Sequence, residues 1–197
     1  MTKAILAGFF IGIGAAVYLT LGGVVGAAFF SVGLATILVF GFSLFTGKAG
    51  LLATGEIRPW ELLCVWVWNC AGVYICALLL MLTPIGAGLV AKAAAIVDVR
   101  NSNTMVENLV LGIFCGVLMY AAVAGYKKTG NLFYIVLPVV TFIMVGCNHC
   151  VADMAYIMLG SDEWADLISL VPTTAGNVIG CNFIPLLMRL GERKADG

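Results

Sequence analysis

Charged residues are scarce in this 197-residue chain, where they make up only 10% of the sequence and ten basic residues balance ten acidic ones. A soluble domain usually has about 25% charged residues, so ordinary soluble composition is excluded. No basic patch with interleaved aromatic residues occurs, and we therefore expect no nucleic-acid partner. A cleavable leader is not indicated either. Met1-Thr2-Lys3 runs straight into an apolar stretch without a small-residue cleavage site, and we interpret that stretch as a first span.

Hydrophobic residues, in contrast, make up 62% of the chain. A membrane span needs about 20 apolar residues, so roughly six spans fit and leave no room for a soluble catalytic domain. We therefore predict an all-α membrane protein with a single transmembrane domain over residues 1–197, and no enzyme activity. A less apolar stretch from Thr83 to Asn103 predicts a short interfacial helix around Gly88–Val97. The apolar segments are 4–20, 25–54, 61–82, 105–126, 131–160 and 165–190.

The basic residues predict the orientation, because cytoplasmic loops carry an excess of Lys and Arg. If the N-terminus is inside, only Lys92 and Arg100 lie outside. We therefore predict a multi-pass protein of the cell (inner) membrane with both termini in the cytoplasm. The basic residues then expected on the cytoplasmic side are Lys3, Lys48, Arg58, Lys127, Lys128, Arg189, Arg193 and Lys194.

The chain also repeats itself at a spacing of 104 residues. Gly8-Phe9-Phe10-Ile11-Gly12 corresponds to Gly112-Ile113-Phe114-Cys115-Gly116, and Ala71–Ile75 corresponds to Ala175–Ile179. Three spans per repeat is an odd number, so the second repeat (about 101–197) must be inverted relative to the first (about 1–100). Inverted repeats with broken helices and a midplane site are typical of transporters.

Polar residues interrupt the second and the fifth apolar segments. Ser43–Lys48 interrupts one, and Gly146–Cys150, followed by Asp153, interrupts the other. The 104-residue spacing pairs Phe45 with His149, so the two interruptions are predicted symmetry mates. Irregular backbone within a membrane must be buried in protein or line a cavity. We therefore predict two broken helices that meet at the midplane and offer their ends to an anion.

His149 is the only histidine, and its ordinary pKa of about 6.5 allows proton exchange near neutrality. A lone histidine between membrane helices is more often a structural hydrogen-bonding residue, but its position in a break that faces a second break favours a functional role. Cys147 and Cys150 flank it with a spacing that also serves redox and metal sites. Because no second ligand pair occurs, we expect no metal and no cofactor. The closely spaced glycines are predicted to pack helices together; they are Gly8, Gly12, Gly72, Gly112, Gly116, Gly176 and Gly180.

Three motifs together resemble the formate/nitrite transporter family. They are Leu44-Phe45-Thr46-Gly47, Gly146-x-x-His149-x-x-Ala152-x-Met154 and Gly176-Asn177-Val178-Ile179-Gly180. The resemblance extends from about Lys3 to about Leu190. It implies an aquaporin-like protomer of six helices in a homopentamer, with a pore in each protomer. It also implies passage of small monovalent anions or their acids: formate, nitrite, hydrosulfide, and sometimes acetate or lactate.

The same resemblance assigns roles to individual residues. It implies a polar centre at Thr46 and His149, beside Asn148, and a vestibule with Arg100 and Lys48. The residues implied to form the apolar constrictions are Phe30, Leu34, Leu44, Phe45 and Phe142. His149 is expected to donate either a proton or a hydrogen bond, and the sequence leaves both open.

Several positions depart from the family pattern. Arg100 stands where a vestibule lysine is common, Asn148 where formate channels often have glutamate, and Gly116 and Val73 where asparagines are usual. The function implied is therefore passive or proton-coupled passage of a small anion or weak acid, with formate or nitrite first. Two alternatives stay open. One is a neutral small-solute channel on the same fold, and the other is a membrane redox protein that uses Cys147, His149 and Cys150.

Overall fold

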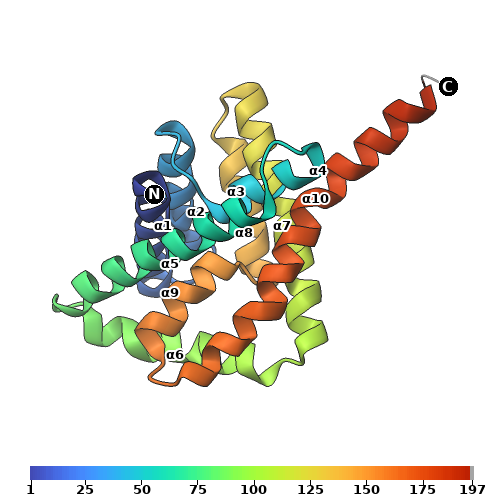
Figure 1. Ribbon diagram of the computed structural model, residues 1–197. Helices are drawn as coiled ribbons and strands as arrows, with labels where there is room; N and C mark the ends of the chain where they lie inside the picture. The colour runs from blue at the N-terminus through green and yellow to red at the C-terminus, as the bar shows by residue number, and fades with distance from the viewer. Residues whose placement is uncertain (196–197) are drawn as a thin grey trace.

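The computed structural model describes residues 1–195, and for Trp164 and residues 193–195 it describes the backbone alone. Within this range the chain is helical and contains no strand (Figure 1). The helices are α1 (Thr2–Leu21), α2 (Gly23–Val39), α3 (Phe45–Ala49), α4 (Leu51–Thr54), α5 (Pro59–Met81), α6 (Gly86–Ser102), α7 (Met105–Thr129), α8 (Phe133–Val145), α9 (Cys150–Gly160), the 3₁₀ helix η1 (Trp164–Ser169) and α10 (Leu170–Ala195).

Helices occupy each of the apolar segments found in the sequence, and the number of six spans stays a prediction. The helix expected around Gly88–Val97 is longer than predicted, because α6 spans 17 residues. Four helices are long and apolar enough to cross a membrane: α1, α5, α7 and the stretch Ala165–Glu192 that contains most of α10. The pair α8 and α9 is bent by 55° at its four-residue break and brings the number to five if it is counted as one span; α2 is a shorter apolar helix.

The short helices α3 and α9 lie at the centre of the arrangement, between two long helix pairs (Figure 1). One pair is α1 with α5, and the other is α7 with α10. Helix α3 contacts α5, α7 and α10, and α9 contacts α1, α5, α6 and α10. The two polar interruptions of the sequence are therefore brought to the middle of the molecule.

Glycines allow the two long pairs to pack with their backbones in close contact. A Cβ atom on Gly8 would overlap the backbone of Asn69, and one on Gly72 would overlap the backbone of Ile5. In the second pair, a Cβ on Gly112 would lie 2.7 Å from the Thr173 carbonyl oxygen, a distance that real Cβ atoms do not reach. The predicted packing role of these glycines is confirmed. The first two contacts recur at a spacing of 104 residues, as Gly112 against Thr173 and Gly176 against Leu109.

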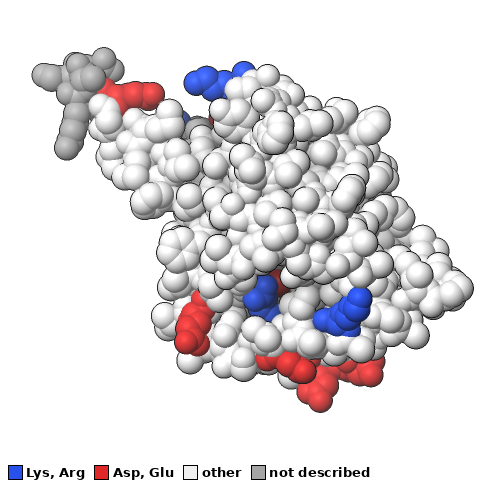
Figure 2. Space-filling model, turned by 180° about the vertical axis from the view of Figure 1, so that it is seen from behind, with Lys and Arg blue, Asp and Glu red and all other residues white. Residues whose placement is uncertain are grey.

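The outer surface is apolar over a broad band. Phe29, Phe114 and Phe183 are each more than half exposed, with exposed fractions of 59%, 58% and 52%. Figure 2 shows charged side chains gathered toward opposite ends of one face, with an uncharged band between them. Soluble monomers rarely expose apolar surface on this scale, so the band is suited to lipid or to neighbouring subunits.

Candidate functional site: a polar pair between two cavities

Two buried asparagines hold the breaks that precede α3 and α9. Asn69, on α5, accepts a hydrogen bond from the Phe45 backbone N–H at 2.8 Å. Its amide nitrogen donates to the carbonyl oxygens of Ala4 at 2.8 Å and Ser43 at 2.9 Å. Because every one of these groups comes from a break or a helix backbone, Asn69 fixes the start of α3 against α1 and α5.

Asn177, on α10, does the same for the start of α9. It accepts from the Cys150 backbone N–H at 2.9 Å. It donates to the carbonyl oxygens of Gly112 at 2.9 Å and Asn148 at 2.8 Å. We call Asn69 and Asn177 the asparagine clamps.

The clamps reveal a different register from the one predicted for the breaks. Asn69 bonds to Ser43 and Phe45, and Asn177 bonds to Asn148 and Cys150. The breaks therefore correspond at a spacing of 105 residues, one more than the glycine contacts of the long helices. By this hydrogen-bonding register the counterpart of His149 is Leu44, and each of the two is the residue that precedes its short helix.

His149 and Thr46 form a hydrogen-bonded pair between the two halves of the chain. The Thr46 Oγ1 and His149 Nε2 atoms lie 2.9 Å apart, and both side chains are buried. The other ring nitrogen, Nδ1, accepts a hydrogen bond from the Ala152 backbone N–H at 3.1 Å and so caps α9. A nitrogen that accepts carries no proton, so Nε2 bears the proton and donates it to the Thr46 oxygen. The hydroxyl hydrogen of Thr46 is then free to donate to another group.

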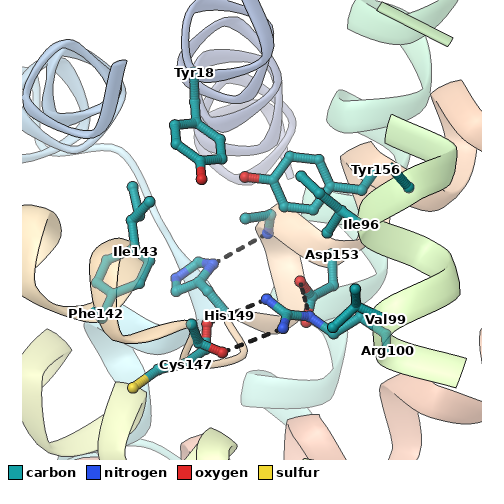
Figure 3. Close-up of a pocket in the computed structure, with 13 residues that line it drawn as sticks. Tyr18, Ile96, Val99, Arg100, Phe142, Ile143, Cys147, His149, Asp153 and Tyr156 are labelled. Atoms are coloured by element: carbon teal, nitrogen blue, oxygen red, sulfur yellow. Dashed lines mark hydrogen bonds and ion pairs between the residues drawn. The ribbon is translucent and has the colours of Figure 1, made fainter. Parts of the chain in front are cut away.

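A cavity of about 220 Å³ reaches His149 from the side of α6. Figure 3 shows His149 on one side of this cavity and Arg100 with Asp153 on another, with Tyr18 and Tyr156 opposite them. The Arg100 Nε atom lies 3.4 Å from Asp153 Oδ1. Its terminal nitrogens donate to the carbonyl oxygens of Gly146 at 3.2 Å and of Cys147 at 3.4 Å. Arg100 is therefore tied to the break beside His149, and its charge is paired. We call this space the α6-side cavity.

A second cavity, of about 200 Å³, reaches Thr46 from the side of α7. It is lined by residues of α3, α4 and α7, among them Tyr120 and Lys127, and by Glu56 just after α4. Since Thr46 lines this cavity and His149 lines the α6-side cavity, the 2.9 Å hydrogen bond between them lies between the two spaces. We call the second space the α7-side cavity.

Aromatic rings cover the polar pair. The Phe142 ring stacks on the His149 ring at a centroid distance of 5.7 Å and an interplanar angle of 19°. Phe30 meets Phe142 edge to face at 6.1 Å. Both phenylalanines are buried. The structure thus brings Phe30 against Phe142, which stacks on His149, and the role of the two rings as a constriction stays a prediction.

Four other residues predicted to line the pore line neither cavity. Leu34 and Leu44 are buried in the apolar core and line neither cavity. Phe45 is buried but lines a separate apolar groove between α5 and α10. Lys48 is half-buried and also lines neither cavity. The structure therefore leaves the predicted pore roles of these four residues as predictions.

Asn148 is completely buried, and its side chain bonds to residues of α7 and α10. Its amide nitrogen donates to Asn108 Oδ1 at 2.7 Å, and to Thr173 Oγ1 at 3.4 Å. It lines neither cavity. Its contacts are those of a residue that fixes the break against α7 and α10.

Sequence reasoning missed both clamps and the partner of Asp153. A signal for Asn69 and Asn177 was present, since an amide in the middle of an apolar run must find partners inside the protein. No sequence signal indicates that Arg100 reaches Asp153, 53 residues later, because that contact depends on how α6 crosses α9. Cys147 and Cys150 are both buried, and no cluster of three or more potential metal-ligating side chains occurs among the described residues.

Comparison with known proteins decides the family. A family model described as formate/nitrite transporter matches residues 1–190, nearly the whole chain. The chain belongs to the formate/nitrite transporter family. The resemblance noted from the three motifs is thereby confirmed, and the chain is an integral membrane transport protein.

Individual members of the family agree with this assignment. A probable formate transporter from Methanothermobacter thermautotrophicus is 30% identical over 190 residues, covering 78% of this chain and 69% of its own length. A solved structure described as an FNT family ion channel has the same fold, with a TM-score of 0.84 and 23% identity over 98% of this chain and 88% of its own. Another solved structure, described as a pentameric formate channel with formate bound, has a TM-score of 0.80 and 24% identity. The match covers 95% of this chain and 94% of the channel's chain. These relatives are transporters and channels rather than enzymes.

Proposed function

We propose that the chain passes small monovalent anions or their weak acids across the membrane, with formate or nitrite as the preferred substrates and hydrosulfide and acetate as further candidates. The observation that carries the proposal is the Thr46–His149 hydrogen bond, which joins one residue from each cavity. A relative described as a probable formate transporter and a structural neighbour described as a formate channel support the choice of substrate.

The polar pair suits a substrate that carries oxygen atoms. With Nε2–H of His149 donating to Thr46, the Thr46 hydroxyl hydrogen is available to an anion or acid at the centre. Protonation of Nδ1 requires release of the Ala152 N–H that it accepts. In this conformation His149 therefore acts as a neutral hydrogen-bond donor, and proton donation by an imidazolium needs the cap of α9 to open.

The aromatic rings suit discrimination against hydrated ions. Phe30 and Phe142 place apolar surface beside His149, where water has few partners. Constrictions of this kind exclude ions by dewetting. A neutral acid crosses such a place with far less desolvation cost than its anion.

The arrangement of the spans, the oligomeric state and the orientation in the membrane are part of the same proposal. We infer six spans in two inverted repeats, with α2 to α4 and α8 to α9 as the broken spans of an aquaporin-like protomer. The two asparagine clamps support it, because they bind equivalent groups in each half. The likeness to a formate channel described as pentameric favours a homopentamer with a pore in each protomer. The distribution of basic residues favours cytoplasmic termini in the inner membrane.

A neutral small-solute channel is the second candidate. The observation in its favour is the Arg100–Asp153 ion pair, which leaves the α6-side cavity without net formal charge. The redox alternative finds less support, since Cys147 lines the α6-side cavity with His149 but Cys150 lines neither cavity.

The test is substrate flux in proteoliposomes that contain the purified protein. Formate, nitrite, hydrosulfide and acetate are compared with formamide, a neutral molecule of nearly the size of formic acid. We expect the first two to pass fastest. Faster passage of formamide than of any anion or acid would favour the neutral-solute channel and contradict the proposal.

The His149→Asn variant tests the role of the histidine in the same assay. Asparagine can cap α9 and donate a hydrogen bond, but it does not titrate. The ratio of wild-type to variant formate flux removes the effect of substrate ionisation. We expect that ratio to stay constant from about pH 5 to 8 if His149 only donates a hydrogen bond. A ratio that changes several-fold over that range would show proton donation instead.

A further inference from the structure

The α6-side cavity contains two formally charged side chains among the described residues that line it, and they have opposite signs. Arg100 comes from α6 and Asp153 from the first turn of α9. Their side chains are 14% and 5% exposed, so both charges are largely removed from water. An anion that enters this cavity therefore meets a cation whose charge is already opposed by a carboxylate.

The pair is loose compared with an ordinary arginine–carboxylate contact. It joins one nitrogen to one oxygen at 3.4 Å, whereas strong pairs use two parallel bonds at about 2.7–2.9 Å. Asp153 Oδ2 is buried and has no hydrogen-bond partner among the described residues. A buried carboxylate oxygen without a partner is destabilising. The placement of Asp153 is therefore difficult to explain by stability alone.

Asp153 resembles the expected substrate chemically. Formate and nitrite each carry two oxygens that can accept hydrogen bonds from a guanidinium. Asp153 places one carboxylate oxygen, Oδ1, 3.4 Å from Arg100 Nε. Removal of Asp153 would leave Arg100, half-enclosed by α6, α9 and the break, as an unpaired cation. A cation in that setting binds an anion strongly, because the anion replaces a missing partner.

We propose that Asp153 determines the substrate affinity of the α6-side cavity, by opposing the charge of Arg100 so that a two-oxygen monoanion is held weakly and released onward to the polar pair. The inference rests on the proposed function. Conduction requires binding strong enough for entry but weak enough for exit. Arg100 attracts the anion for entry, and Asp153 weakens its binding so that it can leave.

The test is a set of charge variants, measured as formate flux against formate concentration in proteoliposomes. Asp153→Asn keeps the side-chain volume and removes the negative charge. We expect the half-saturating formate concentration to fall about tenfold and the saturated rate to fall with it. Arg100→Gln should raise the half-saturating concentration by at least as much. The double variant, again without net charge, should return to within about threefold of the wild type.

Further arms separate this role from a structural one. Asp153→Glu keeps the charge and should retain the wild-type half-saturating concentration to within about threefold. A carboxylate with a merely structural role could change the amount of pentamer or the saturated rate. It would not lower the half-saturating concentration on removal and restore it when the cation is also removed. If Asp153→Asn yields no pentamer, the test rests on the other two variants: Arg100→Gln should raise the half-saturating concentration, and the double variant should bring it back toward the wild-type value.

Two different failures are distinguishable. If the wild type passes formate or nitrite but Asp153→Asn leaves the half-saturating concentration unchanged or raises it, this inference is wrong and the proposed function stands. If the wild type passes no anion or weak acid at all, the proposed function itself is wrong.

Discussion

The starts of α3 and α9 share a scaffold but differ in chemistry. Each start is fixed by an asparagine from a long helix, which binds one N–H and two carbonyl oxygens. The residue before α3 is Leu44, whose side chain caps nothing, whereas the residue before α9 is His149, whose ring caps α9 and contacts Thr46. The scaffold is repeated, and the titratable group is present once.

The difference shows how a two-fold arrangement can carry an asymmetric site. Thr46 lies two residues after Leu44 and reaches across to the histidine of the other half. The polar pair therefore consists of unlike members, and each half contributes one. A change to either clamp should affect the scaffold, whereas a change at His149 should affect the chemistry. Variants of the two breaks can test that division.

The largest effect on formate flux is expected when the residue before α9 is changed to the residue that precedes α3. His149→Leu places at α9 the residue that already precedes α3, and loses both ring hydrogen bonds. We expect formate flux to fall at least a hundredfold, because the hydrogen bond to Thr46 disappears from the centre of the path. The two lost hydrogen bonds should together cost about 2 kcal/mol, so the pentamer should still form. Flux in proteoliposomes and size by gel filtration measure the two effects.

The matched control for this exchange is Leu44→Met, a change of similar volume at the counterpart position. It should leave flux within about threefold of the wild type. Wild-type flux in His149→Leu would show that the path does not depend on the histidine, and the comparison between the two starts would then lose its functional meaning.

The second prediction concerns the clamps. Asn69→Ala and Asn177→Ala each remove three hydrogen bonds of a buried side chain and leave backbone groups without partners. We expect each to lower the free energy of unfolding by about 2–4 kcal/mol, given about 1 kcal/mol per bond in membrane and soluble proteins. Thermal dissociation of the pentamer in detergent is the measurement. Asn101→Ala, which removes an exposed bond to Asp166, is the control and should cost under about 1 kcal/mol.

The two clamp variants should have similar effects if the halves are equivalent scaffolds. A loss at Asn177 that exceeds the loss at Asn69 by more than about 2 kcal/mol would show that the second clamp does more than hold backbone.

The sequence predicted the scaffold better than the site. Apolar runs indicate the helices directly, and glycine spacing indicates the close faces, because both depend on residue type along one helix. The breaks were also visible as polar residues within apolar runs. The predicted pairing of the two breaks was wrong by one residue, 104 instead of 105. The glycine motifs lie in the long helices, so they carry no information on the additional residue between Gly112 and α9.

The side-chain contacts between different helices could not be predicted from the sequence. Arg100 is tied to Asp153 and to the backbone before α9 because α6 packs on α9, a geometry that no motif encodes. The sequence similarly does not show that His149 caps α9, or that its Nδ1 is the ring nitrogen that accepts from the Ala152 N–H. The histidine could be identified as the centre, but whether it offers a proton or a hydrogen bond depends on that contact.

The third prediction removes bulk from the predicted constrictions. Phe142→Ala deletes the ring that stacks on His149, and Leu34→Ala deletes a buried side chain that lines neither cavity. We expect Phe142→Ala to raise the ratio of acetate to formate flux several-fold, because a wider apolar passage admits the extra methyl group. Leu34→Ala should raise it less. An unchanged substrate ranking in both variants would place the narrow part of the pore elsewhere.

The smallest effect is expected for the two cysteines that flank His149. At the 105-residue spacing of the breaks, Cys147 and Cys150 correspond to Phe42 and Phe45, so the first half builds the same kind of break without thiols. We therefore expect the double variant Cys147→Ala/Cys150→Ala to form pentamers and keep formate flux within about threefold of the wild type, at a modest cost in stability from the lost buried atoms. The metal content of the purified wild type, measured by mass spectrometry, completes the test. A stoichiometric metal that disappears together with flux in the double variant would favour the redox alternative. It would also end the comparison between the two breaks, because the second break would then be built around a site that the first one lacks.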